Sequence, residues 1–134
     1  MRFNDGTPIY RQIAGQLRED IVEGLLADDE QVMSTNQYAS FHRINPATVA
    51  KAFQELVDED LIFKKRGLGM FVRPGAQERL RAHRRARFID DRIAPVLAEA
   101  ERLGMTVDQV VDAVRSAADR RTPTRRRTQG ADRP

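Results

Sequence analysis

The chain contains no cysteine. Disulfide bonds and thiolate metal sites are therefore excluded, and such a chain fits the reducing environment of the cytoplasm. The two histidines, His42 and His83, lie too far apart in sequence to form a recognisable metal-binding motif. We therefore expect neither a metal nor another cofactor.

Long apolar runs and catalytic motifs are also missing. No segment approaches the roughly 20 apolar residues of a membrane-spanning helix, and Met1–Asp5 leads into no apolar core of a signal peptide. There is no glycine-rich phosphate loop and no serine or cysteine nucleophile beside a base motif. The paired carboxylates Asp90 and Asp91 lie in a charged helical stretch. We expect a cytoplasmic protein that has no membrane span and is not an enzyme.

What the sequence does contain is an uneven distribution of charge. Residues 1–60 carry 5 Lys or Arg against 11 Asp or Glu, whereas residues 61–87 carry 9 against 1. Residues 88–134 are nearly balanced, with 9 against 8, and the whole chain has a net charge of +3. Such a basic block indicates either a surface for a polyanion or a solvated helix face, and charge alone favours the two equally.

Two helix starts lie close together in the middle of the chain. The stretch 34–37 matches a capping box, in which Ser34 caps the helix and Gln37 bonds back to the cap amide. Asn45 and Pro46 open a second helix, because asparagine is a favoured N-cap and proline is tolerated at the first helical position. We expect helices over residues 35–41 and 46–59, joined by a short connection.

A basic hairpin follows these helices. Residues 61–65 are expected to form a strand, Gly67 and Gly69 to supply positive φ in the turn, and residues 70–73 to form the returning strand. Residues 31–33 are a candidate for one further short strand. Two short helices followed by a β-wing are the parts of a winged helix-turn-helix.

An amphipathic helix precedes this unit. Apolar residues recur every four positions from Ile9 to Ile21, behind an expected cap at Thr7 and a proline at Pro8. Gly24 is a plausible stop for this helix.

A longer helical pattern follows the hairpin, from residue 77 to residue 103. Because Pro95 lies inside it, we expect a kink there or a break just before it. A capping box at Thr106 and Gln109 opens a last helix. We expect that helix to bury Val107, Val110, Val111, Val114 and Ala117.

The expected fold is mainly α with a small β-wing. Residues 1–75 would form a winged helix-turn-helix DNA-binding domain and residues 76–120 a helical dimerisation region. Residues 121–134 lack periodicity and are rich in Arg, Thr and Pro, so we expect a disordered basic tail.

The exposed side of the second helix and the wing are the candidate DNA-binding surface. Short or hydrogen-bonding side chains near the start of a helix can read bases in the major groove, while helix amides and basic wing residues bind phosphates. Taken singly, each residue on the helix face is better explained as a solvated surface residue, and only the context of cap, turn and wing favours base reading by the helix as a whole. His42 and Arg43 fit a helix C-terminus equally well. The candidates are Thr35, Asn36, His42, Arg43, Asn45, Ala47, Thr48, Lys51, Gln54, Lys64, Lys65, Arg66, Gly67 and Gly69.

The C-terminal helices cannot bury their own apolar faces. They need a partner surface, which is either the first helix or, preferably, a second copy of the chain, because a symmetric dimer doubles the groove contacts. The candidate interface residues are Phe88, Ile89, Ile93, Val96, Leu97, Ala100, Leu103, Val110, Val111 and Val114. A region of this size has room for at most a small effector pocket.

Four segments in order resemble the GntR family of winged-helix regulators. They are residues 8–13, 34–39, 44–49 and 65–72. The Asn-Pro pair at residues 45–46 and the short C-terminal part resemble the YtrA-like subfamily, which implies a dimeric transcription regulator. The family usually has arginine where this chain has Asn36, often arginine at Ala50, and glycine at Asp29.

We therefore expect a sequence-specific DNA-binding transcriptional regulator, preferably a repressor, that binds a palindromic operator as a homodimer. The alternatives are an architectural DNA-binding protein, for which the basic segments would suffice, and a winged-helix module for protein–protein contact.

Overall fold

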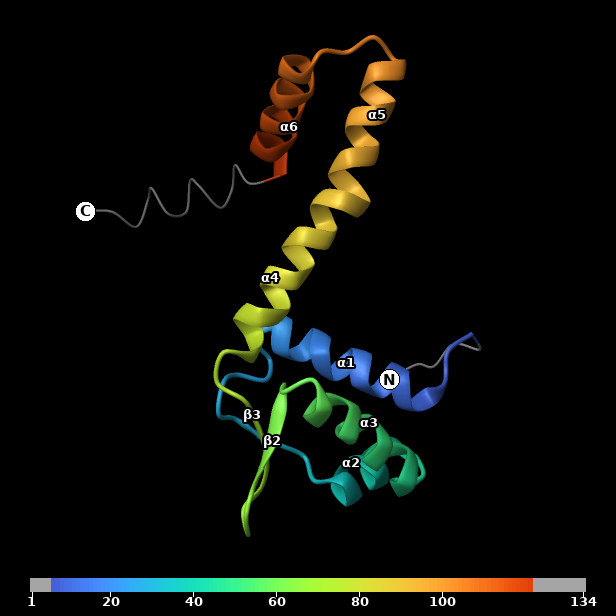
Figure 1. The fold of residues 1–134 in the computed structure, drawn as a ribbon, viewed down its shortest axis with the longest axis vertical. Coiled ribbons are helices and arrows are strands. Elements are labelled where there is room, and N and C mark those ends of the chain that lie inside the picture. The colour runs from blue at the N-terminus through green and yellow to red at the C-terminus, as the bar shows by residue number, and fades with distance from the viewer. Residues whose placement is uncertain (1–5, 122–134) are drawn as a thin grey trace, which may run out of the picture. The chain divides into compact units, whose positions relative to one another are not determined.

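The computed structural model describes residues 6–121, and the chain divides into two compact units, residues 1–85 and residues 86–134. The first unit holds α1 (Ile9–Glu23), β1 (Gln31–Val32), α2 (Thr35–His42), α3 (Pro46–Asp58), β2 (Ile62–Lys65), β3 (Gly69–Val72) and most of α4 (Ala76–Phe88) (Figure 1). The second holds the end of α4, η1 (Ile89–Ile93), α5 (Ala94–Arg102) and α6 (Val107–Arg121). The predicted fold class, mainly α with a small β-wing, is confirmed.

The start of α1 differs from the prediction by one residue. Pro8 is the N-cap, with φ −54° and ψ 142°, and the helix begins at Ile9. The Pro8 carbonyl accepts the first helical hydrogen bonds from the amides of Arg11 and Gln12. No side chain caps this helix start, so the predicted cap at Thr7 is wrong. Gly24 ends α1 in the left-handed region at φ 84°, as predicted.

The ends of α2 and α3 follow the predicted local chemistry. The Ser34 hydroxyl accepts from the Gln37 amide at 3.0 Å, and the Gln37 side chain accepts from the Ser34 amide at 3.0 Å, which completes the capping box. Asn45 caps α3 through a 2.8 Å hydrogen bond from the Ala47 amide, with Pro46 as the first helical residue. Both predicted helices are therefore confirmed to within a residue at each end.

The three strands of the described chain form an antiparallel sheet in the order β1-β3-β2. In the β2–β3 hairpin Ile62 pairs with Val72 and Lys65 pairs with Gly69. The short strand β1 adds Gln31 opposite Phe71, so the predicted third strand is present. Just before it, Asp29 has φ 64°, a conformation that aspartate tolerates better than most residues.

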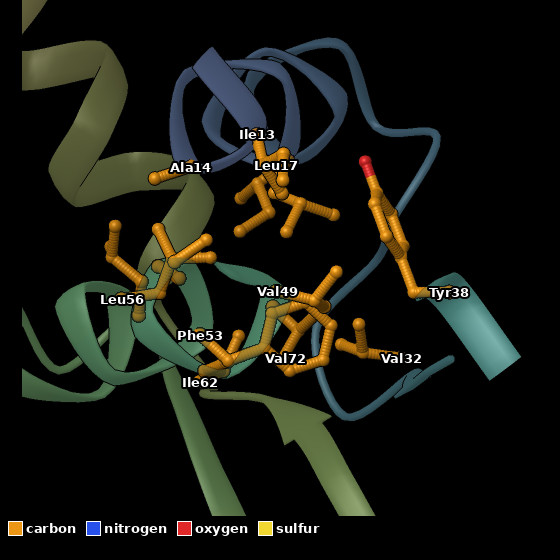
Figure 2. Close-up of a cluster of buried hydrophobic side chains, with 14 of the residues drawn as sticks. Ile13, Ala14, Leu17, Val32, Tyr38, Val49, Phe53, Leu56, Ile62 and Val72 are labelled. Carbon is orange, nitrogen blue, oxygen red and sulfur yellow. The ribbon is translucent and has the colours of Figure 1, made fainter. Parts of the chain in front are cut away.

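The core lies between α1, α3 and the sheet. Figure 2 shows Ile13 and Leu17 on α1 facing Val49 and Phe53 on α3, with the strand residue Ile62 below them. The predicted apolar faces of α1 and α3 are therefore the buried ones, except that Ile9 at the start of α1 is 45% exposed. Burying these faces stabilises the unit and leaves the opposite side of α3 exposed.

The long helical segment does not break before Pro95. Between α4 and α5 the chain widens into five residues of π-helix, Ile89–Ile93, in which the Ala94 amide bonds the Ile89 carbonyl. Proline has no amide proton to continue the normal α-helical ladder, and a π-turn is one way to absorb that loss. Of the two predicted alternatives, the break before Pro95 is wrong, and a change in helix type lies there instead; the kink stays a prediction.

In α6 the predicted capping box is confirmed, but the predicted burial is not. Thr106 and Gln109 exchange hydrogen bonds of 2.8 and 3.1 Å. Val107 and Val114, however, are 64% and 61% exposed. Within residues 86–121 only Ala100 is buried, because two helices side by side offer too little apolar surface to enclose these faces. Arg121 ends α6, and the rest of the predicted disordered tail, residues 122–134, lies outside the described residues.

Candidate nucleic-acid interface

The exposed face of α3 begins at its N-terminus. Ala47, Lys51 and Gln54 are exposed, and Thr48 beside them is half-buried. Because Val49, Phe53 and Leu56 on the other side are buried, this polar face is fixed outward by the core. The Gln54 side-chain amide donates to Asp58 Oδ1 at 2.9 Å, one turn further along, and so retains one N–H donor and its carbonyl oxygen for another partner.

Lys51 has a partner that its sequence neighbourhood does not predict. Its ammonium nitrogen lies 4.2 Å from the centroid of the Tyr10 ring on α1. Ile9, Tyr10, Ala47, Thr48 and Lys51 line one open hollow of about 410 Å³. The start of α1 and the start of α3 therefore form a single surface.

The connection between α2 and α3 is tight. Arg43 ends α2 in the left-handed region at φ 57°, and its side chain is exposed. His42 is half-buried, with its ring centroid 4.3 Å from that of Tyr38 and 4.8 Å from that of Phe41. The His42 ring therefore packs in an aromatic cluster, whereas Arg43 projects into solvent.

At the start of α2, Asn36 is exposed and Thr35 is half-buried. The amide of Gln37 is already bonded to the Ser34 side chain. The amides of Thr35 and Asn36 lie ahead of it in the first turn, where an anion is favoured.

The wing places its three basic residues differently. Lys64 and Arg66 are exposed. Lys65 points to the opposite face of the hairpin from Lys64, and its ammonium lies 4.3 Å from the Phe71 centroid and 3.8 Å from Asp29 Oδ1. Lys65 is therefore already engaged with the protein on its own face of the hairpin.

Gln31 is a second residue whose role no sequence motif predicts. Its side-chain amide donates to the Leu68 carbonyl at the wing turn, at 2.8 Å. A Cβ atom on Gly69, which has φ 118°, would lie 2.8 Å from the same nitrogen. Glycine is therefore required at residue 69 for this contact. No local sequence signal marks Gln31 or Tyr10, because their partners are distant along the chain.

The arginines of α4 bond largely to the protein itself. Arg81 donates twice to the Val22 carbonyl near the end of α1, at 3.1 and 2.9 Å, and Arg84 pairs with Glu19. Arg79 donates to the Asp60 carbonyl. Several arginines of the basic block therefore hold α4 against the rest of the winged helix. The charge of the block alone did not predict these contacts.

In the second unit, α5 and α6 form a helical hairpin with an apolar hollow of about 570 Å³. Its lining residues are Pro95, Val96, Glu99, Ala100, Leu103, Met105, Val110, Ala113, Val114 and Ala117. Of the predicted interface residues, Val96, Ala100, Leu103, Val110 and Val114 line this hollow, while Phe88, Ile89, Ile93, Leu97 and Val111 are exposed elsewhere in the segment 86–121.

Within residues 6–121 no group of three or more His, Asp or Glu side chains is arranged to hold a metal ion. In the same part of the chain, no helix combines the length and the apolar character that a bilayer crossing requires.

Comparison with known proteins agrees with this geometry. Residues 9–72 match the model of the gntR family of bacterial regulatory proteins. The HTH-type transcriptional repressor YtrA of Bacillus subtilis is 28% identical over 104 residues, which cover 78% of this chain and 79% of YtrA.

Solved structures share the fold. A transcriptional regulator from Oenococcus oeni is 25% identical and has a TM-score of 0.69, covering 88% of this chain and 97% of its own. YtrA from Sulfolobus acidocaldarius, a GntR-family transcription factor, is also 25% identical, with a TM-score of 0.50, and covers 90% of this chain and 96% of its own. Residues 9–72 therefore form a winged helix-turn-helix domain of the GntR family, and the chain is a DNA-binding transcriptional regulator rather than an enzyme.

Proposed function

We propose that this chain is a sequence-specific repressor that binds a palindromic operator as a homodimer in the cytoplasm. In this proposal α3 enters the major groove, and the β2–β3 wing contacts the backbone or the minor groove. The observation that carries it is the exposed polar face of α3, which starts at the Asn45 cap and is held outward by a buried apolar face. A helix fixed in this way is suited to present side chains to base edges.

The residues on this face match the chemistry of the major groove. Lys51 can donate to guanine O6 and N7, and Ala47 can contact a thymine methyl group. Gln54 can bond adenine N6 and N7 with the N–H donor and the carbonyl oxygen that its hydrogen bond to Asp58 leaves available. Lys51 lies nearer the N-terminus of α3 and is the residue best placed for base reading.

The wing and the start of α2 supply phosphate contacts in this proposal. Lys64 and Arg66 are exposed at the wing. The Arg79, Arg81 and Arg84 side chains bond to the winged helix itself, which favours a few wing contacts over a broad basic surface. This pattern supports sequence-specific binding over an architectural role.

The apolar surface of the second unit supports the homodimer. Phe88, Ile89, Val96 and Leu103 are each at least half exposed. Apolar patches of this kind on a helical hairpin mark a protein interface, and a second copy would bury the same patch by two-fold symmetry. Two-fold symmetry also matches a palindromic operator.

The similarity to the B. subtilis repressor YtrA over most of both chains supports repression. Selection of bound sites from random DNA, followed by footprinting, tests the proposal. We expect one protected palindrome. Protection without sequence preference would favour an architectural protein, and binding with no salt dependence would favour a protein-interaction module.

A panel of single-base operator variants then tests α3. We expect Lys51→Ala to weaken operator binding by roughly 1–3 kcal/mol and to relax the preference at one position in each half-site. An equal loss on every variant would show that Lys51 contacts phosphate instead of a base.

A further inference from the structure

We propose that Tyr10, on the first turn of α1, is a positioning residue for DNA reading, because its ring holds the Lys51 ammonium in place on α3. This inference rests on the proposed role of α3 in the major groove. It extends the reading surface from one helix to two.

The geometry is that of a cation over an aromatic face. Lys51 Nζ lies 4.2 Å from the Tyr10 centroid, well within the range in which the electron-rich ring face attracts a cation. The two residues line the same hollow as Ala47 and Thr48, at the start of α3. The lysine is therefore held beside the other residues proposed to read bases.

Tyr10 is itself fixed. Its ring is half-buried and packs against the hydrophobic core cluster. On the exposed side its hydroxyl accepts a hydrogen bond from Arg11 Nε at 3.1 Å. The ring is thus a rigid platform, whereas the lysine above it is long and exposed.

This arrangement matters because lysine is flexible. A free lysine side chain loses much rotamer freedom when it binds. A lysine already held over a ring loses less rotamer freedom when it binds. The ring face restricts the position of the ammonium group without a conventional hydrogen-bond acceptor. The N–H donors that point away from the ring remain available for a base edge.

A double-mutant cycle tests the coupling. We expect Tyr10→Leu to weaken binding to the selected operator by about two- to fivefold and to relax the same base preference as Lys51→Ala. Tyr10→Phe keeps the ring and should bind within about twofold of wild type. In the Lys51→Ala background, Tyr10→Leu should have no further effect on binding.

The matched control is Ile9→Ala, which alters the same hollow without removing the ring. It should leave base preference unchanged even if it lowers thermal stability. In the DNA-free protein, NMR should show the Lys51 ε-methylene protons shifted upfield by the ring in wild type and Tyr10→Phe but not in Tyr10→Leu.

Three outcomes would overturn the inference. They are a wild-type protein without the upfield shift, an equal effect of Tyr10→Leu with and without Lys51, and a Tyr10→Phe protein as weak as Tyr10→Leu. If one of these outcomes occurs while the wild-type protein still selects one operator sequence, the proposed function remains intact. A wild-type chain that selects no operator would instead overturn the proposed function and the Tyr10 role with it.

Discussion

Arg18 on α1 binds Glu59, at the end of α3, through two parallel hydrogen bonds. Arg18 Nε lies 2.9 Å from Glu59 Oε1, and Arg18 Nη2 lies 2.6 Å from Glu59 Oε2. The same Nη2 also donates to Glu55 Oε2 at 2.5 Å. The hydrogen bond to Glu59 raises the pKa of Arg18, against a lowering by partial burial, with Glu55 adding to the rise. This pair ties the helix proposed to read DNA to the helix that supports it.

Removing this link should destabilise the winged helix. We expect Arg18→Ala to lower the free energy of unfolding by about 1–2 kcal/mol, between the values typical of exposed ion pairs and of charged hydrogen bonds. Urea unfolding measures the change. The matched control is Arg85→Ala, whose partner Glu78 lies on the same helix with both side chains more than 60% exposed. That variant should change stability by less than about 0.5 kcal/mol, and equal losses would contradict the prediction.

The wing residues should govern the salt dependence of DNA binding. Replacing Lys64, Lys65 and Arg66 by alanine should weaken specific and nonspecific binding together. The slope of log affinity against log salt should fall by about 0.9 for each phosphate that the variant no longer neutralises. Since Lys65 already lies against Phe71 and Asp29, it should contribute the least of the three.

A variant with Arg81, Arg84 and Arg85 changed to alanine is the control for the wing experiment. It removes the same net charge, but its arginines bond to Val22, Glu19 and Glu78. We expect a smaller change in salt slope than in the wing variant. The wing assignment is wrong if the order is reversed.

The proposed dimer should depend on the α5–α6 surface. Val96 and Leu97 are 50% and 41% exposed within their own chain. Changing both to aspartate should leave the chain folded but separate the dimer into monomers, because burying uncompensated charge costs several kcal/mol. Sedimentation at tens of micromolar protein is the measurement. A wild-type protein that sediments as a monomer there would rule out this interface.

Stability at high pH should depend on Tyr38. Burial raises the pKa of Tyr38 to about 12, with the Asp20 charge adding to the rise, whereas the ordinary value is 10.0. Between these two pH values the unfolded chain loses this proton while the folded chain keeps it. The contribution of Tyr38 is therefore fully present below pH 10 and is lost as the pH rises toward about 12, by about 1.4 kcal/mol per unit.

Urea unfolding across this pH range measures the effect. Tyr38→Phe should flatten the fall in the free energy of unfolding, because phenylalanine has no proton to lose. Tyr10→Phe serves as the control. In this variant the free energy of unfolding should still decrease with pH by the amount that Tyr38 contributes. Identical curves for wild type and Tyr38→Phe would contradict the assignment.

The sequence by itself determined the elements whose causes are local. The Ser34–Gln37 and Thr106–Gln109 capping boxes, the Asn45 cap and the Gly24 stop act within a few residues, and each forms as predicted. The buried faces of α1 and α3 follow from helical periodicity alone. Pro95 signalled a disturbance of the long helix, but a local pattern did not distinguish a break from a π-turn.

Tertiary structure decided what the charged and aromatic side chains do. Sequence distance hides the contacts of Lys51 with Tyr10, of Gln31 with Leu68 and of the α4 arginines with α1, because each joins segments that only folding brings together. Charge composition reveals a basic block but does not predict which residues it contacts. Apolar spacing predicts an apolar helix face but not whether a single chain can bury that face. For this reason Val107, Val111 and Val114 of α6, predicted to be buried, lie exposed in the single chain. Helical periodicity fixes which side of a helix is apolar, while burial requires a second surface.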